Sequence, residues 1–349
     1  MAACQLAVSR QPFGAKKQFH YCWQDLKRSQ LITIKTLLKE AVNRLNSLDA
    51  KQEVIILMQH AFNKSHAWLI AHENDAMEAN NQADFESLLQ RRINGEPIAY
   101  ILGYREFYGL NLKVTPDTLI PRPDTETLVE AALAIIPQST VSPLSSFPRK
   151  RESTLNLNQK MDSRLRGNDK ISNISENSQP LSILDLGTGS GAIALAIAKH
   201  RPQALVYALD ASQAALDIAI ENAQNLTIAN VKFLLSDWFS ALNQDNNLQQ
   251  FDIIVCNPPY IEAADAHLNQ GDLRFEPPTA LASGADGLDA IRTIITQAPQ
   301  HLNPHGWLLL EHGYNQADKV AVLLKQAGFS EVSHAKDLAG INRVTLGCL

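Results

Sequence analysis

The 349-residue sequence predicts an α/β fold, with a doubly wound, mostly parallel sheet and a small helical bundle ahead of it. After Leu181, continuous apolar strand patterns such as SILDLG and FDIIVC alternate with amphipathic helix patterns such as AIALAIAKH. That alternation is typical of parallel strands covered by helices on both faces. The last two strand patterns, EVSHAKD and NRVTLGCL, have no helix between them, so we expect an antiparallel hairpin at one edge of the sheet.

The region before the sheet carries apolar residues at helical spacing. Leu38, Ala41, Val42 and Leu45 fall on one face of a helix that begins near Thr33. Helices pack against one another through such apolar faces. This region therefore predicts a helical bundle.

Capping and breaking residues set the bounds of the bundle. Ser65 is expected to begin a third helix and Asp84 a fourth, because short polar side chains favour helix starts. Gly95 followed by Pro97 ends the last helix. We place the bundle at residues 31–96.

Other segments complete the predicted organisation. Residues 1–30 show no sustained periodicity and are expected to be a disordered or artefactual leader. Residues 97–122 hold short β-prone pieces broken by glycine and proline, which predicts a β-hairpin linker. The sheet domain then spans 123–349. It is interrupted at 139–179 by a stretch rich in Ser, Asn, Arg and Lys, which we expect to be a disordered insertion.

Composition argues against several classes of protein. The formal net charge of −5 lacks the basic excess of general nucleic-acid binders, so no stable nucleic-acid partner is expected. The four cysteines form no CxxC pair, which indicates neither a metal site nor a disulfide framework. No apolar run reaches the roughly 20 residues of a membrane span, and no secretory signal is present. We expect a soluble cytoplasmic protein with no membrane partner.

A glycine-rich loop follows the first strand of the predicted sheet. In the run DLGTGSG, glycines allow a tight turn and a close backbone approach to a ligand at the carboxyl edge of a Rossmann-like sheet. Dinucleotide sites share this pattern, and a glycine turn that only packs the helix on the strand is the alternative. The candidate cofactor-binding residues of this loop are Gly187, Thr188, Gly189, Ser190 and Gly191.

Acidic residues follow the next two strands. Asp210 ends the second strand, where a carboxylate accepts the hydroxyl protons of a ribose in many nucleoside-bearing cofactors. After the third strand, Asp237 and Trp238 are expected to meet an adenine amine and ring face. Asp237 could instead cap the helix that follows.

The fourth strand is followed by the tetrapeptide Asn257, Pro258, Pro259 and Tyr260. Two adjacent prolines remove backbone donors and fix φ, so the carbonyls of this loop point in set directions. The Asn257 oxygen and the Pro258 carbonyl can each accept one proton of an NH₂ group and hold its nitrogen in line with a sulfonium methyl. We expect Tyr260 to stack on the planar acceptor. The alternative is a proline-rich turn without catalytic meaning.

Together these motifs resemble the PrmC/HemK family of protein-(glutamine) methyltransferases. The resemblance covers about residues 33–137 and 181–349, and its most specific pieces are IPRPDTE, LDLGTGSGAIALA, SDWFSAL, NPPYI, GDLRFEPPTAL, LLLEHG and RVTLG. It implies S-adenosyl-L-methionine as the cofactor and the GGQ-motif glutamine of class I peptide release factors as the methyl acceptor. It also implies that the glycine loop, Asp210, Asp237, Trp238 and Asn257 contact the cofactor and that the helical bundle docks the release factor.

Five charged residues within these pieces are further candidates. Arg122, Asp124 and Glu126 precede the sheet domain, and in the resembling family their segment lies against the cofactor site. A capping box at the next helix, with Asp124 or Thr125 as the cap, explains them equally well. Glu276 and Glu311 follow later in the sheet domain, and we expect them to support the site and not to act in catalysis.

Other functions remain open at this point. A related enzyme that methylates a glutamine of a large-subunit ribosomal protein would share every motif. A nucleic-acid amine methyltransferase would also use an NPPY loop, although such enzymes usually carry a basic surface or a target-recognition domain. A non-catalytic cofactor-binding or adaptor protein is the third alternative.

Overall fold

The computed structural model describes residues 32–76, 78–136, 180–242 and 249–349. The chain divides into two compact units, Met1–Leu102 and Gly103–Leu349. The predicted leader at 1–30 and the predicted insertion at 139–179 lie outside the described residues.

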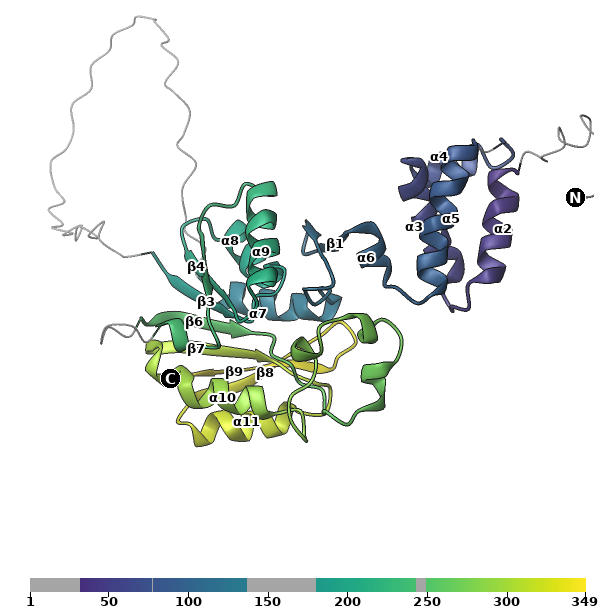
Figure 1. The fold of residues 1–349 in the computed structure, drawn as a ribbon. Coiled ribbons are helices and arrows are strands. Elements are labelled where there is room, and N and C mark those ends of the chain that lie inside the picture. Colours follow the sequence, from purple (N-terminus) through teal and green to yellow (C-terminus); the bar gives the residue numbers. More distant parts are fainter. Residues whose placement is uncertain (1–31, 77, 137–179, 243–248) are drawn as a thin grey trace, which may run out of the picture. The chain divides into compact units, whose positions relative to one another are not determined.

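The first unit is helical (Figure 1). The central helix α3 packs against α2 and α5. Its Leu57 and Met58 are buried together with Phe85 and Leu89 of α5. The helices of this unit are α2 (Ile34–Arg44), α3 (Ala50–Phe62), α4 (His66–Ala71), α5 (Ala79–Ile93) and α6 (Ile98–Leu102).

Two of the three helix starts predicted from capping residues are confirmed. Thr33 accepts a hydrogen bond from the Thr36 N–H at the start of α2, and Ser65 accepts one from the Trp68 N–H at the start of α4. The start expected after Asp84 is wrong. The helix begins six residues earlier, after Glu78, whose side chain makes no capping hydrogen bond and so offers no capping signal in the sequence.

A second difference concerns the start of the predicted linker. The sequence predicts β-prone residues from Tyr100 onward. In the structure the first of them belong to helix α6, because the Pro97 carbonyl accepts hydrogen bonds from both the Tyr100 and the Ile101 N–H. Proline both ends one helix and starts the next, because its fixed φ suits a first turn. The sequence analysis predicted only that Pro97 ends a helix, and not that it begins the next one.

The second unit opens with a two-stranded hairpin, β1 (Tyr104–Phe107) and β2 (Leu110–Lys113). The two turn residues, Tyr108 and Gly109, have φ of 49° and 71°, the positive values that a type I′ turn needs. Asn222 of α9 pairs with both the N–H and the carbonyl of Lys113, at 2.7 and 3.0 Å. The hairpin is therefore fastened to the main sheet domain.

The main sheet has seven strands in the order β5-β4-β3-β6-β7-β9-β8. Strands β3 to β7 pair in parallel, and β9 pairs antiparallel with both β7 and β8. The predicted antiparallel edge hairpin is thus confirmed. The strands are β3 (Ser182–Leu186), β4 (Leu205–Asp210), β5 (Val231–Leu235), β6 (Phe251–Cys256), β7 (Leu302–Glu311), β8 (Ser330–Lys336) and β9 (Asn342–Cys348).

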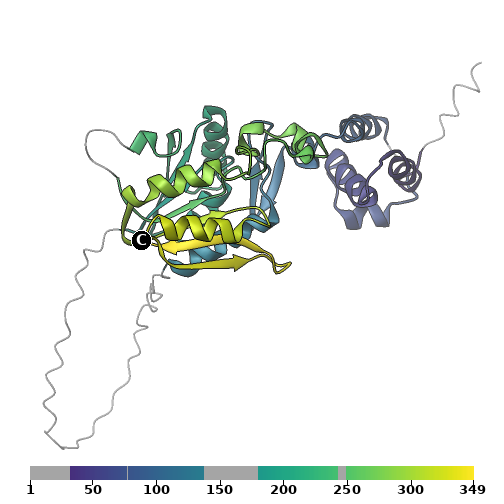
Figure 2. The same ribbon diagram turned by 90° about the horizontal axis from the view of Figure 1, so that it is seen from below.

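Helices cover both faces of this sheet (Figures 1 and 2). Alternate strand residues point to opposite layers, so Ile183 of β3 packs with α7 and α8 while Leu184 packs with α10 and α11. The predicted doubly wound sheet is confirmed. Its helices are α7 (Glu126–Ile135), α8 (Ala192–His200), α9 (Gln213–Asn225), α10 (Asp289–Gln297) and α11 (Ala317–Gln326).

Short 3₁₀ turns lie in the loops of the same unit. They join the longer elements around the carboxyl edge of the sheet and at its far end. Their bounds are η1 (Pro123–Thr125), η2 (Ser240–Leu242), η4 (Ala266–Asn269), η5 (Leu273–Phe275), η6 (Pro278–Ala280) and η7 (Ala298–Gln300).

Candidate functional site

The order of the strands in the main sheet determines where the candidate site lies. From β3 the chain builds outward to β4 and β5, and it then returns to the other side of β3 as β6. At this switch point Leu186 lies opposite both Leu209 of β4 and Cys256 of β6. Loops that leave adjacent strand ends on opposite faces of a sheet leave a crevice between them, where open α/β folds bind ligands.

A cavity of about 560 Å³ opens at this switch point. Eight of the predicted site residues line it, namely Gly187, Gly189, Asp210, Asp237, Trp238, Asn257, Pro258 and Pro259. Four others do not, namely Thr188, Ser190, Gly191 and Tyr260. The remaining lining residues come mainly from two other segments, 116–119 and 277–280, and from the start of α9.

The three glycines of the loop have different environments. A Cβ added to Gly187 or Gly189 would meet nothing within 4 Å, and both residues line the cavity with φ of 69° and 57°. A Cβ on Gly191 would lie 3.0 Å from Leu195 and 3.2 Å from Ala219. Gly187 and Gly189 thus give a ligand access to the backbone. Gly191 fits the alternative role, because it lets the loop pack on α8 and α9.

The other two loop residues, Thr188 and Ser190, are buried. The Thr188 hydroxyl donates to Asp185 Oδ2 at 2.6 Å, and the Ala194 N–H donates to the same oxygen at 3.1 Å. Burial raises the pKa of Asp185 to about 7. Thr188 therefore fastens the loop to Asp185 of β3, which also binds the start of α8, and it does not line the cavity.

Asp210 lies at the end of β4 with its carboxylate between two loops. Its Oδ2 accepts from the Gly189 N–H and its Oδ1 from the Ser212 N–H, each at 2.8 Å. Each oxygen has a second lone pair, and the residue lines the cavity. The carboxylate can therefore hold the glycine loop and accept hydroxyl protons from a ligand at the same time.

Asp237 and Trp238 line the next wall of the cavity. Ser236, and not Asp237, supplies the side chain that caps the following turn, since its Oγ accepts from the Ala241 N–H at 3.0 Å. The capping alternative for Asp237 is wrong, and its exposed carboxylate remains available to a ligand. Trp238 has a φ of 47°, which turns the chain sharply at this wall.

Two side chains of the tetrapeptide after β6 form hydrogen bonds with residues that do not line the cavity. Asn257 Nδ2 donates to Thr125 Oγ1 at 3.2 Å, and Tyr260 Oη donates to Glu311 Oε1 at 3.4 Å. Asn257, Pro258 and Pro259 line the cavity, whereas Tyr260 packs in the layer with α10 and α11. Burial, and then the nearby Glu311 carboxylate, raise the pKa of the Tyr260 phenol.

Charged residues of the segment Ile120–Glu126 pair with residues far away in the chain. Arg122 forms an ion pair with Glu276, which is buried and also accepts from the Ile120 N–H at 3.1 Å. Asp124 pairs with Arg343 at 2.9 Å. None of these charged side chains lines the cavity. The contacts of Glu276 fit its expected supporting role, whereas the direct contact with the site left open for Arg122 and Asp124 receives no support from the cavity lining.

The capping box, one of the two alternatives for this segment, is wrong. Thr125 occupies the cap position but makes no capping hydrogen bond with its side chain, because its hydroxyl contacts Asn257. Glu126 accepts from the Tyr108 N–H at 3.0 Å and so holds the turn of the β1–β2 hairpin. The Thr125 hydroxyl and the Glu126 carboxylate, which a local cap would use, instead form hydrogen bonds with residues far away in the sequence.

Two lining segments contain none of the predicted cofactor-binding or catalytic residues. Residues 116–119 and the pair Thr279 and Ala280 face the cavity from loops that precede α7 and α10. The second of these follows the adjacent prolines Pro277 and Pro278, a signal of the same kind as the one in the tetrapeptide. Residues 116–119 carry no comparable signal.

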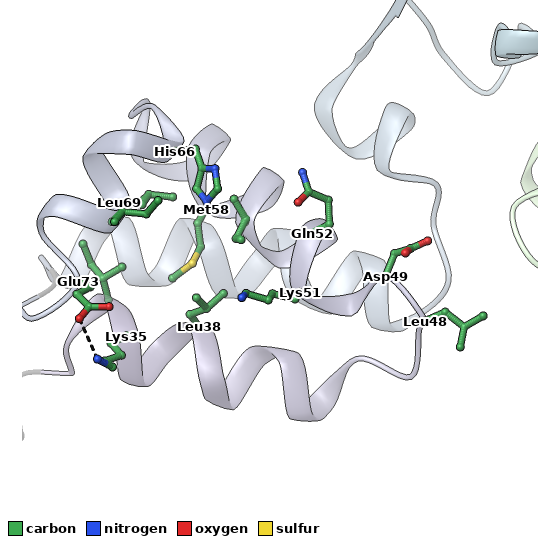
Figure 3. A pocket seen from close by; sticks show the side chains of 13 residues that line it. Lys35, Leu38, Leu48, Asp49, Lys51, Gln52, Met58, His66, Leu69 and Glu73 are labelled. Atoms are coloured by element: carbon green, nitrogen blue, oxygen red, sulfur yellow. Dashed lines mark hydrogen bonds and ion pairs between the residues drawn. The ribbon is translucent and has the colours of Figure 1, made fainter.

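A second cavity, of about 570 Å³, lies within the helical unit between α2, α3 and α4 (Figure 3). Leu38, Met58 and Leu69 line its interior, and an ion pair of 2.8 Å between Lys35 and Glu73 lies at one end. It holds none of the predicted site residues. Its apolar walls suit a contact surface better than a reacting centre.

Two further observations concern metals and membranes. In the parts of the chain that the structure describes, no three His, Cys, Asp or Glu side chains come together as ligands for a metal ion. Within those same parts, none of the helices combines the length and the apolar composition needed to cross a membrane.

Known proteins resemble the chain over most of its length. A family model described as methyltransferase domain matches residues 177–336, and one described as PrmC N-terminal domain matches residues 36–103. The release factor glutamine methyltransferase of Salmonella typhimurium is 42% identical over 311 residues, which are 89% of this chain and 96% of that protein. That of Bordetella pertussis is 43% identical over 316 residues, which are 90% and 100% of the two.

Among solved structures, the release factor-specific protein-(glutamine-N5) methyltransferase of Alicyclobacillus acidocaldarius is 27% identical to this chain. The match covers 68% of this chain and 98% of that one, with a TM-score of 0.34.

The division among the glycines can be tested by stability. Gly189→Ala is expected to cost about 1–2 kcal/mol, the strain of an L residue at positive φ. Gly191→Ala should cost about 1–3 kcal/mol more, because its Cβ also crowds Leu195 and Ala219. Urea unfolding of the two variants beside the parent measures both values. Equal losses would contradict the packing role of Gly191.

Proposed function

We propose that this chain, which belongs to the release factor glutamine methyltransferase family, methylates the side-chain amide nitrogen of the GGQ-motif glutamine in class I peptide release factors. The enzyme is an S-adenosylmethionine-dependent protein-(glutamine-N5) methyltransferase. The orientation of Asn257 is the single observation that carries the acceptor chemistry. Its NH₂ group faces Thr125, which leaves Oδ1 free to accept a proton at the cavity.

The residues of the cavity fit the cofactor. Gly187 and Gly189 leave room for a ligand against the backbone, and the spare lone pairs of Asp210 suit ribose hydroxyls. Asp237 and Trp238 are placed to meet an adenine amine and ring. When bound, S-adenosylmethionine supplies an electrophilic methyl group.

The tetrapeptide would hold the acceptor. An amide nitrogen is a weak nucleophile because its lone pair is delocalised into the carbonyl. Hydrogen bonds from both of its protons, to Asn257 Oδ1 and the Pro258 carbonyl, make the nitrogen more electron-rich and stabilise the positive charge that develops on it. Both acceptors come from one rigid loop, so the nitrogen is held in line for direct transfer.

The expected stacking of Tyr260 on the acceptor receives less support. Its hydroxyl donates to Glu311 and the residue does not line the cavity. We infer that Tyr260 supports the loop from behind, while Pro258 and Pro259 form the surface that the acceptor meets.

The relatives favour a release factor over the other acceptors. They are named for release factors and cover nearly the whole chain, including the helical unit. The absence of a stable nucleic-acid partner and the cytoplasmic location remain predictions from the sequence. Mass spectrometry of release factor from cells with and without this gene tests the acceptor. A GGQ glutamine that carries a methyl group in both strains would contradict the proposal.

We further propose that the helical unit docks the release factor at the second cavity, between α2, α3 and α4 (Figure 3), which we call the groove. Leu48 and Ile70 line this groove and remain 107% and 61% exposed, although they are large apolar side chains. A partner that covers them would remove that apolar surface from water. We take a release factor as that partner, because the relatives are named for release factors.

Leu48→Asp is expected to raise the KM for full-length release factor by at least about tenfold with kcat unchanged. Burial of a leucine contributes about 1.5–3 kcal/mol, and 1.4 kcal/mol is about tenfold. Leu338→Asp is the matched control, because Leu338 is 109% exposed and lies in the second unit. Steady-state kinetics of both variants decide the point. Equal KM values in the two would remove the groove as the docking site.

Asn257 and Asp210 should give opposite defects. Asn257→Ala is expected to abolish methyl transfer and leave cofactor affinity near that of the parent, since the side chain addresses the acceptor. Asp210→Ala should weaken cofactor binding by roughly 1.5–3 kcal/mol, the range of hydrogen bonds to a charged group. Calorimetric titration with S-adenosylmethionine measures both. Loss of binding in Asn257→Ala would show that its assigned role is wrong.

A further inference from the structure

A buried asparagine of α9 joins two segments that lead to the cavity. Asn222 is 1% exposed. Its Nδ2 donates to the Ser190 carbonyl of the glycine loop at 2.9 Å and to the Lys113 carbonyl at the end of β2 at 3.0 Å. Its Oδ1 accepts from the Lys113 N–H at 2.7 Å. Both protons and the oxygen of the amide are thus used, and only this orientation of the amide satisfies all three partners.

Both of these segments form walls of the cavity. Ser190 directly follows Gly189, which lines the cavity, and Lys113 is three residues ahead of the lining segment 116–119. Strands β1 and β2 form a sheet of their own, whereas the glycine loop follows a strand of the main sheet. A backbone ladder therefore does not set the position of one wall against the other. The Asn222 side chain makes that link, from outside the cavity.

The segment 116–119 is compact and is also held at its far end. The Thr118 hydroxyl donates to the Thr115 carbonyl at 3.2 Å and accepts from the Thr115 N–H at 3.3 Å, which closes a tight turn. Beyond the turn, the buried carboxylate of Glu276 accepts from the Ile120 N–H at 3.1 Å. The segment therefore has a fixed shape, and its place beside the glycine loop depends on the link at Lys113.

We propose that Asn222 is a positioning residue for the cofactor. By binding Ser190 and Lys113 with one amide, it fixes the separation of the glycine loop and segment 116–119 before the cofactor enters. It does not line the cavity and acts only through these two walls. The inference rests on the proposed function, because that proposal places S-adenosylmethionine in this cavity.

The expected consequence concerns affinity and not the transfer step. A site whose loops are already ordered loses less conformational freedom when its ligand binds, and so binds more tightly. Without Asn222 the cofactor itself would have to bring the two walls together. Once it is bound, its own contacts hold them. Loss of Asn222 should therefore weaken cofactor binding and leave kcat at saturating cofactor close to that of the parent.

The neighbouring residue offers a matched control. The Glu221 carboxylate pairs with the Lys113 ammonium group at 2.7 Å, and both side chains are exposed. Glu221 thus shares its helix and its partner residue with Asn222. Within the described residues it has no hydrogen bond to the glycine loop. Exposed ion pairs contribute little to stability, so Glu221→Gln should leave the two walls in place.

The test is calorimetric titration of the full chain with S-adenosylmethionine. Asn222→Ala is expected to raise the cofactor Kd about tenfold, the effect of losing roughly one hydrogen bond that holds the site. Asn222→Asp should act in the same direction, because it keeps the acceptor for Lys113 but lacks both donors. Glu221→Gln should bind as the parent does. In steady-state kinetics the KM for the cofactor should rise in Asn222→Ala, with the KM for full-length release factor unchanged.

A second control separates positioning from a general loss of stability. Leu324 of α11 is 0% exposed and does not line the cavity. Leu324→Ala should lower the Tm through the space it leaves in the core, with the cofactor Kd unchanged. The parent itself gives a measurement that needs no variant. Its Lys113 N–H should be protected from hydrogen exchange before any cofactor is added.

The outcomes separate this inference from the proposed function. An unchanged Kd in Asn222→Ala refutes the positioning role alone, and so does a Lys113 N–H that is protected only after cofactor is added. An equal rise of Kd in Leu324→Ala also refutes it, because lowered stability would then explain the effect. If Asp210→Ala binds the cofactor as tightly as the parent, the cavity is not the cofactor site and both proposals fail. A parent that binds the cofactor but does not methylate release factor refutes only the proposed acceptor.

Discussion

The pairing of β3 with β6 is the constraint on which the site depends. Leu186 lies opposite Cys256, so the glycine loop and Asn257 leave the sheet from adjacent strand ends. Because parallel strands all end at one edge, β4 adds Asp210 to the same place. A register shift of one residue would move the buried side chains of a strand to the other helical layer, so packing of both faces protects the geometry of the site.

Buried carboxylates hold the loops around this edge. Asp185 fastens the glycine loop, Glu276 holds the segment before α7 through Ile120 and Arg122, and Glu311 supports the tetrapeptide. Burying a charge costs free energy unless partners offset that cost. All three carboxylates receive hydrogen bonds from residues of these loops. They give the loops of the site fixed positions without lining the cavity themselves.

The sequence by itself determined the sheet, the two layers of helices and eight of the residues that line the cavity. Apolar periodicity is a local property, and the residues that follow strands of a parallel sheet must gather at one edge. Asp210, Asp237 and Asn257 reach the cavity for that reason. The errors, at the start of α5 and in α6, occurred where a helix begins without a capping side chain or directly after a proline.

Only the tertiary structure decided what each motif residue contacts. Gly189 opens onto the cavity and Gly191 packs on helices, although both belong to one repeat of alternating glycines. Thr125 turns from a local cap to Asn257, 132 residues away in the chain. Tyr260 turns from the cavity to Glu311, 51 residues away. A local pattern specifies which side chains are available at a strand end. Their partners are set by packing between distant segments, which leaves no mark at any one position in the sequence.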